Sequence, residues 1–239
     1  MSVELTIGIA TYDDFDGAWF TVESLRLHHP QWMDHNEILV LDNHPEAPSA
    51  EPLSRLAEQI PNVRYVPETT VRSTAVRDLL FRHAHGEIVL VLDSHVLLAP
   101  GALDALLAYF RSRPGCRDLV QGPLLSADAR GLTGTHWNPV WSEGMYGRWA
   151  VDPRGLDPGA EPFDIPMQGL GLFACRRDAW PGLSPRFRGF GARRATCTRR
   201  CGAPAVAPSA CPRCAGCTGS TGRAGCRTGC RGTTGSATI

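Results

Sequence analysis

The stretch Glu87–Leu92, EIVLVL, is followed at once by Asp93-Ser94-His95. An apolar run of this length that ends in polar residues predicts a β-strand buried on both faces. Three other segments share this character, and we expect them to form neighbouring strands: Val3–Ala10 (VELTIGIA), Glu37–Leu41 (EILVL) and Val63–Val66 (VRYV). Strands without a regular apolar–polar alternation are typical of a parallel sheet that helices cover.

Helical patterns alternate with these strands, at Gly17–Leu27, Ala50–Gln59, Ser73–His83 and Pro100–Phe110. This alternation predicts an α/β, Rossmann-like fold with a mainly parallel sheet and helices on both faces. Asp118–Pro123 is a further strand candidate. Ser126–Phe163 is rich in Gly, Pro and Trp, and we expect it to be a long irregular loop region that carries function.

Polar residues follow three of the predicted strands, at Thr11–Asp14, Asp42–His44 and Asp93–His95. Ligands of parallel sheets bind at the carboxyl ends of the strands, so these loops predict a binding site. Asp93 and His95 can both turn toward one ion, and a carboxylate with an imidazole suits a divalent cation such as Mn2+ or Mg2+. The alternative is that Asp93 caps the following helix and that His95 is an ordinary surface residue.

Charge and cysteine usage limit the classes of partner. The chain has no lysine, and its first 191 residues hold 16 arginines against 24 acids, a net charge of −8, which argues against nucleic acid as a partner. No apolar run is long enough for a membrane span, and no signal peptide is visible. Cys116 and Cys175 are isolated, which suits a cytoplasmic location.

The composition changes abruptly after Gly191. Residues 192–239 contain seven of the nine cysteines and eight arginines, with no acid and no Leu, Phe, Trp, Tyr or Met. Such a segment cannot bury enough apolar surface to fold, so we expect a disordered tail. The sequence therefore predicts one incomplete domain over residues 1–191 and a low-complexity tail over residues 192–239.

Three origins of the tail are open. Cys211, Cys214 and Cys217 have a C-x2-C-x2-C spacing that zinc sites use, and the seven cysteines could also form disulfides. We favour a shifted reading frame, because GC-rich DNA that is read out of frame yields Arg, Ala, Gly, Thr and Cys. One base restored after the codon for Gly191 turns all seven cysteine positions into Leu, Val or Met. The restored text can begin Gly-Glu-Glu and contain Trp-Val-His.

Several motifs occur in a characteristic order. Thr11–Phe15 (TYDDF), a strand ending at Asp42, Val76-Arg77-Asp78 and Gly86–His95 (GEIVLVLDSH) precede two later segments, Pro166–Arg177 (PMQGLGLFACRR) and Phe187–Gly191 (FRGFG). Over residues 3–191 this order resembles the GT-A glycosyltransferases, most of all the family 2-type bacterial enzymes. The Asp-x-His form of their metal motif is also similar to that of the polypeptide N-acetylgalactosaminyltransferases.

The resemblance implies an enzyme that transfers a sugar from a nucleotide-sugar donor, with a UDP-sugar expected, to a sugar, natural-product or protein acceptor. It assigns a role to each candidate residue: nucleotide binding by Thr11, Tyr12, Asp42, Arg77 and Asp93; metal binding by Asp93 and His95; and the donor or acceptor pocket to Trp137, Trp149, Gln168 and Gly169. The competing interpretations are a turn residue at Asp42, a solvated helix face at Arg77, core packing for the tryptophans and a strand-end polar residue at Gln168.

The tail departs from the pattern of that family. Ala192, Arg193 and Arg194 stand where the resemblance implies an acidic catalytic residue, and an arginine cannot accept a proton. The catalytic residue therefore stays unknown, and we expect sugar transfer to be impaired. Two alternatives remain, a non-catalytic sugar-nucleotide-binding domain and a cysteine-rich, zinc-binding interaction protein.

Overall fold

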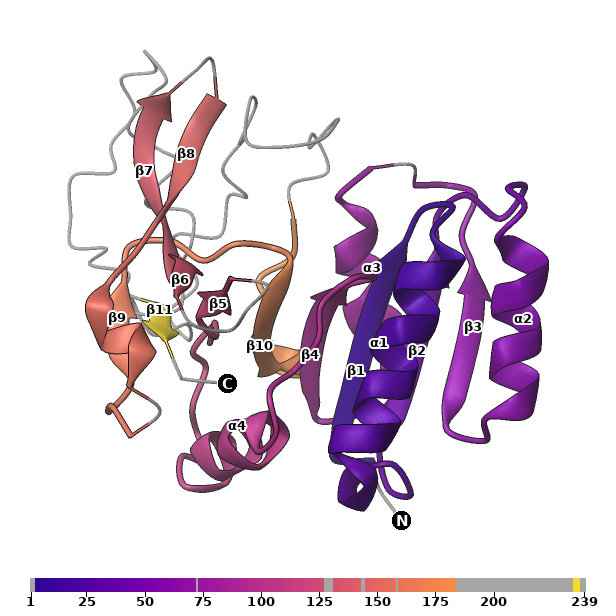
Figure 1. The fold of residues 1–239 in the computed structure, drawn as a ribbon, viewed down its shortest axis with the longest axis horizontal. Coiled ribbons are helices and arrows are strands. Elements are labelled where there is room, and N and C mark those ends of the chain that lie inside the picture. Colours follow the sequence, from indigo (N-terminus) through magenta and orange to yellow (C-terminus); the bar gives the residue numbers. More distant parts are fainter. Residues whose placement is uncertain are drawn as a thin grey trace.

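The largest sheet of the protein has five strands and occupies the right-hand part of Figure 1. The computed structural model describes residues 3–71, 73–126, 131–142, 145–157, 159–183 and 234–236. The strand order is β10-β4-β1-β2-β3, from β1 (Leu5–Thr11), β2 (Glu37–Asp42), β3 (Val63–Pro67), β4 (Ile88–Asp93) and β10 (Leu172–Arg176). All neighbours are parallel except β10, which runs antiparallel to β4. The predicted mainly parallel sheet is therefore confirmed.

Helices cover both faces of this sheet. Helices α1 (Phe15–His28), α2 (Ala50–Gln59) and α4 (Ala102–Arg111) share one apolar core with the odd-numbered positions of β1. Helix α3 (Val76–His83) packs on the opposite face. There it lies close to the backbone, since a Cβ at Gly8 would be 3.0 Å from Leu80. The two cores bury long aliphatic side chains, each of which contributes about 2 kcal/mol of hydrophobic stabilisation.

The predicted helices exist, with shifted ends. Helix α1 begins two residues earlier than predicted because Asp14 caps it, accepting a hydrogen bond from the Gly17 N–H at 3.0 Å. Helix α2 has the predicted bounds. Helix α3 begins at Val76 rather than Ser73, and α4 follows Gly101, whose φ of 81° is left-handed.

A second set of strands lies beside β10, and here two predictions are wrong. The region 126–163 is not irregular, because β7 (His136–Ser142) and β8 (Met145–Ala150) form an antiparallel hairpin. Pro139 interrupts the strand pattern, and a register shift after Asn138 accommodates it. Residues 118–123 form no strand, and Val120 makes an isolated bridge with Ala174. The remaining short elements are β5 (Leu124–Leu125), β6 (Leu132–Gly134), β9 (Phe163–Ile165), β11 (Thr234–Ser236), and the 3-10 helices η1 (Pro30–Trp32), η2 (Pro153–Leu156) and η3 (Arg177–Ala179).

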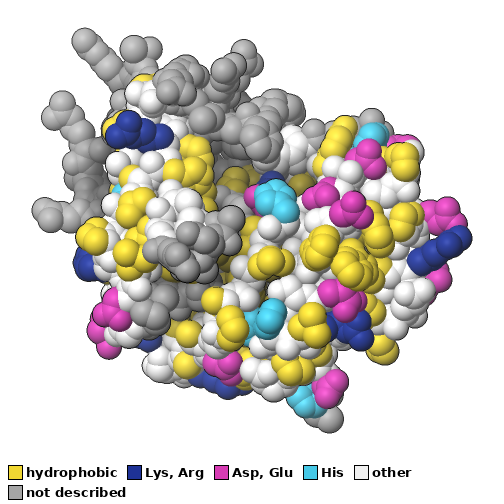
Figure 2. Space-filling view, viewed as in Figure 1, with side chains coloured by type: hydrophobic (Ala, Val, Ile, Leu, Met, Phe, Trp, Pro, Cys, Tyr) yellow, Lys and Arg dark blue, Asp and Glu magenta, His cyan; other side chains and the backbone are white. Residues whose placement is uncertain are grey.

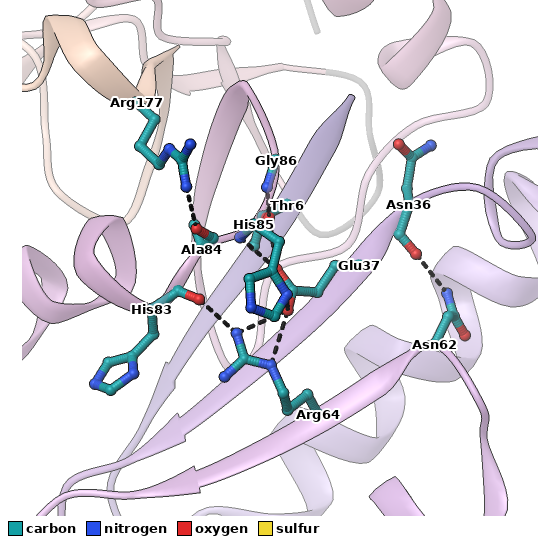
Figure 3. A network of polar contacts seen from close by, with 10 residues as sticks. All are labelled: Thr6, Asn36, Glu37, Asn62, Arg64, His83, Ala84, His85, Gly86 and Arg177. Carbon is teal, nitrogen blue, oxygen red and sulfur yellow. Dashed lines mark hydrogen bonds and ion pairs between the residues drawn. The ribbon is translucent and has the colours of Figure 1, made fainter. Parts of the chain in front are cut away.

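A polar network fixes the amino ends of the strands, opposite the predicted binding edge (Figure 3). Glu37, at the start of β2, is buried and accepts hydrogen bonds from the Thr6 hydroxyl at 2.7 Å, the His85 N–H at 3.0 Å and Arg64 at 2.8 Å. Arg64 also donates to the His83 carbonyl at 2.5 Å. One carboxylate thus joins β1, β2, β3 and the turn that leads into β4.

The thiol of Cys175 is buried in β10, as a packed strand residue should be. Phe187–Gly191 and residues 192–233 lie outside the described residues, so the predictions for the tail are not tested there. Among the helices that the structure describes, none is long and apolar enough to cross a membrane.

Candidate nucleotide and metal site

The carboxyl ends of β1, β2 and β4 bring the candidate residues together. In the sheet register Thr11 is paired with Asp42, and Ala10 with Asp93. Acidic and histidine side chains gather at the end of the molecule where β1 and β2 finish (Figure 2). The structure therefore brings Thr11, Tyr12, Asp42 and Asp93 to one edge.

Asp42 is fully buried and held in place from two sides. Its Oδ1 accepts the His44 N–H at 2.9 Å, and its Oδ2 accepts the Tyr65 hydroxyl at 2.9 Å. Burial raises the pKa of Tyr65, and the hydrogen bond to Asp42 adds to this, so the phenol stays a donor. These two contacts fix the orientation of the buried carboxylate.

Tyr12 and Thr11 differ in accessibility. The Tyr12 side chain is 58% exposed and stacks on the His44 ring, with centroids 4.6 Å apart and an interplanar angle of 16°. The two rings form a flat aromatic surface beside Asp42. Thr11 is buried, and its hydroxyl donates to the Asp14 carbonyl at 3.2 Å.

Arg77, near the start of α3, reaches the end of β4. Its guanidinium forms an ion pair with Asp93 Oδ1 and donates through Nε to the Leu170 carbonyl at 2.9 Å. The Arg77 side chain is 12% exposed, so it is not the solvated helix residue of the competing interpretation. The backbone of Gly171 also approaches Asp93 closely, because a Cβ there would lie 2.5 Å from Oδ2.

Helix α1 fixes the turn that contains Ser94 and His95. The Asp14 carboxylate accepts the Ser94 hydroxyl, and the buried Thr21 hydroxyl donates to the carbonyls of Ser94 at 2.9 Å and Val96 at 3.1 Å. His95 itself is exposed. Asp93 does not cap α4, whose N-cap residue is Gly101.

The residues present fit a divalent cation as two of its ligands. Asp93 offers an oxygen and His95 a nitrogen, a donor set that suits Mn2+. Within the described ranges no three His, Cys, Asp or Glu side chains form a metal-binding group. The remaining ligands of a cation at this edge would have to come from a bound anion or from water.

The second half of the site is a short segment that crosses from the hairpin to the sheet. The Met167 carbonyl accepts the Trp137 N–H at 2.8 Å, the Gly169 N–H donates to Gln121, and the Gly171 carbonyl accepts the Asp93 N–H at 2.9 Å. In each contact the segment uses a backbone group, and Gln121 accepts with its side-chain Oε1. Residues 167–171 therefore connect the hairpin to Asp93, the first residue of the predicted metal motif.

The four predicted pocket residues are neighbours on this segment and the hairpin. Trp137 and Trp149 lie with ring centroids 5.2 Å apart, and a Cβ at Gly169 would be 2.4 Å from the Trp149 ring. Trp149 keeps 38% of its surface exposed. Gln168 is buried, and its Oε1 has no hydrogen-bond partner among the described residues. A buried acceptor of this kind is suited to a donor on a ligand.

Sequence reasoning missed the residues that hold the others: Asp14, Thr21, Tyr65, Ser94 and Gln121. Asp14 carried a usable signal, because an Asp directly before an amphipathic segment favours a helix cap. The other four have no local pattern, since their partners are at least 14 residues away in the chain.

Comparisons with solved structures identify the same fold. The mannosyltransferase PcManGT from Pyrobaculum calidifontis, solved with GDP-Man and Mn2+, is 19% identical with a TM-score of 0.51, over 73% of this chain and 45% of that chain. GalNAc-T7, solved with UDP, GalNAc and Mn2+, is 16% identical with a TM-score of 0.61, over 80% and 39%. S. aureus TarS 1–349 is 15% identical with a TM-score of 0.50, over 73% and 47%. This chain thus spans less than half of each.

No curated protein matches the chain at a significant level. The family model described as glycosyl transferase family 2 matches residues 6–180. This range includes β1 except its first residue, β2 to β4, the Asp93-Ser94-His95 motif and β10. Together with the GT-A fold of the solved relatives, this match shows that the chain belongs to glycosyl transferase family 2.

Proposed function

We propose that this chain binds a nucleotide-sugar donor together with a divalent cation, as the donor-binding part of a sugar transferase. The observation that carries the proposal is the convergence of Asp42, Arg77 and Asp93 at one sheet edge beside the Tyr12–His44 surface. An aromatic surface, a fixed carboxylate, a guanidinium and a metal motif are the groups that a nucleoside diphosphate requires.

In this proposal the base lies against Tyr12. Asp42 accepts a hydrogen bond from the base or ribose once a neighbouring side chain moves aside, because Asp42 is fully buried in the nucleotide-free chain. Thr11 holds the loop at the same strand end, since its hydroxyl donates to the Asp14 carbonyl and its own carbonyl accepts the Asn43 N–H at 3.1 Å. A carboxylate acceptor is compatible with the N–H of a uracil ring, and UDP is the nucleotide that we propose. Arg77 binds the diphosphate, because a guanidinium matches phosphate oxygens in two directions.

Asp93 and His95 would hold Mn2+ or Mg2+. Such a cation supplies Lewis-acid stabilisation of the negative charge on a diphosphate leaving group. The chain's own contribution would be to fix the turn between the two ligands, because Asp14 and Thr21 both hold Ser94.

The sugar and the acceptor would occupy the region of Trp137, Trp149, Gln168 and Gly169. Aromatic rings stack on the apolar faces of sugars, and the unpartnered Gln168 Oε1 can accept a sugar hydroxyl. A sugar, a natural product or a protein hydroxyl would each be compatible with such a pocket as acceptor.

We further propose that residues 1–191 are the transferase domain and that residues 192–239 are out of frame. Ala192, Arg193 and Arg194 offer no general base, so this chain should bind the donor but transfer the sugar poorly. The gene sequence at the codons for Gly189–Ala195 tests the frame directly: an additional base there supports the proposal, and confirmation of the present frame contradicts it.

Calorimetric titration with UDP, with and without Mn2+, tests donor binding. We expect Mn2+-dependent UDP binding that Asp42→Asn weakens about tenfold, because a buried hydrogen bond to a charged group is lost. Asp34→Asn, an exposed acid near the amino end of β2, is the matched control and should leave UDP affinity unchanged. Equal affinity for UDP in both variants would contradict the proposed base site.

Two outcomes separate the alternative functions. UDP binding without any sugar transfer, even after the segment beginning Gly-Glu-Glu is restored, would favour a non-catalytic binding domain. Stoichiometric zinc with thiolate absorption, and no UDP binding, would favour the cysteine-rich interaction protein instead.

A further inference from the structure

Arg77 and the metal motif compete for the same carboxylate. The Arg77 guanidinium is paired with Asp93 Oδ1, while Oδ2 lies against the backbone at Gly171. The main chain of Asp93 cannot move away easily, because its N–H donates to the Gly171 carbonyl at 2.9 Å. A cation that approaches Asp93 must therefore displace or share the contact with Arg77.

The guanidinium is also held on its other side. Its Nε donates to the Leu170 carbonyl at 2.9 Å, and only 12% of the side chain is exposed. Asp93 is 28% exposed, so both members of the pair are largely shielded from water. Like charges repel more strongly when they are shielded from water, and a divalent ion beside this guanidinium would meet such repulsion.

We propose that Arg77 is a placeholder for the metal: it neutralises Asp93 in the nucleotide-free chain and releases it when a diphosphate arrives. This inference rests on the proposed function, because it assumes that a nucleoside diphosphate binds at this edge. The diphosphate supplies the negative charge that both cations need, so the guanidinium can move to a phosphate oxygen while the metal takes Asp93. Binding is then ordered, with the metal weak on its own and tight after the nucleotide.

The placeholder has a signature that a simple phosphate-binding arginine lacks. If Arg77 only bound phosphate, its removal would weaken UDP binding and leave binding of Mn2+ alone unchanged. If it also blocks Asp93, its removal must strengthen binding of Mn2+ alone. The two affinities therefore change in opposite directions.

The test measures the binding of Mn2+ alone, from the electron paramagnetic resonance signal of free Mn2+, and the binding of UDP with Mn2+ by calorimetry. For Arg77→Gln we expect Mn2+ alone to bind about tenfold more tightly and UDP with Mn2+ about tenfold more weakly, the size of one charge-assisted contact. Arg82→Gln is the matched control, because Arg82 lies on the same helix but pairs with Asp78 and is 70% exposed. It should change each affinity less than about twofold.

Arg77→Lys is the second variant and carries the test if Arg77→Gln lacks a cooperative unfolding transition. A lysine cannot donate to Leu170 and Asp93 in the fixed fork of a guanidinium, so binding of Mn2+ alone should tighten by roughly threefold. If the original chain binds UDP with Mn2+ but the folded Arg77 variant binds Mn2+ alone no more tightly than the original chain, the placeholder role is overturned and the proposed function stands. A starting chain that binds neither UDP nor Mn2+ would overturn both.

Discussion

Replacement of Glu37 by Gln tests the network at the amino ends of the strands. The Glu37 side chain is 8% exposed; its Oε2 accepts Thr6 and the His85 N–H, and its Oε1 accepts Arg64. An amide has only one acceptor oxygen, so its NH2 group must face the donors on one side. Each buried donor left without an acceptor costs about 1–3 kcal/mol, and partial exposure of Arg64 allows some hydration. We expect a loss of about 3 kcal/mol in the free energy of unfolding.

Urea unfolding at pH 7 measures this loss. With a dependence of about 2 kcal/mol per molar urea for a domain of this size, the midpoint should fall by about 1.5 M. Glu51→Gln is the matched control, because Glu51 also pairs with an arginine but is 73% exposed, and it should cost less than about 0.5 kcal/mol. Equal losses in the two variants would refute the idea that burial gives the Glu37 network its strength.

The stability difference between the original chain and Glu37→Gln should also depend on pH, which provides an independent check. Burial alone would raise the pKa of Glu37, but the hydrogen bonds from Thr6, His85 and Arg64 outweigh it and lower the pKa below the ordinary 4.5. A lowered folded-state pKa stabilises the protein above the unfolded-state pKa, and this contribution is lost as the pH falls through the folded value. The stability gap between the original chain and Glu37→Gln should therefore narrow below pH 4.5.

Three further perturbations address other parts of the structure. Burial lowers the pKa of His29 below 6.5, so the unfolded chain takes up a proton at a higher pH than the folded chain does. The free energy of unfolding should therefore fall by up to about 1.4 kcal/mol per pH unit below pH 6.5. Urea unfolding of His29→Leu should lack this dependence on pH. Gly171→Ala places a methyl group within 2.5 Å of Asp93 Oδ2, and calorimetry should find UDP with Mn2+ bound about tenfold more weakly. Thr21→Val removes the hydroxyl that holds the turn containing Ser94 and His95, and it should weaken Mn2+ binding severalfold in the same titration. Thr21→Ser keeps the hydroxyl and should keep the original Mn2+ affinity.

The sheet was predictable because its central strands are continuous apolar runs that can be recognised in the sequence. Ile88–Leu92 and Ile38–Leu41 are apolar at every position, and the structure buries all of these residues. The ends of α1 and α3 were less predictable, since they depend on a capping contact at Asp14 and on the loop before Val76. The hairpin β7–β8 was missed because Pro139 breaks its alternation. Aromatic cross-strand pairs, Trp137 with Trp149 and Trp141 with Tyr146, join the two strands on either side of that break.

One part of the candidate site was likewise predictable from the sequence, and another part was not. Asp42 and Asp93 follow recognisable strands, so their shared edge was predictable from the rule that ligands bind at carboxyl ends. The segment 167–171 was not, although it joins the hairpin to Asp93 and to Arg77. Three of its contacts, at Met167, Leu170 and Gly171, are made by backbone carbonyls, a group that every residue carries. A sequence cannot mark such a contact by residue type, and only the absence of a side chain at Gly169 and Gly171, where a Cβ would collide, records how close the segment passes.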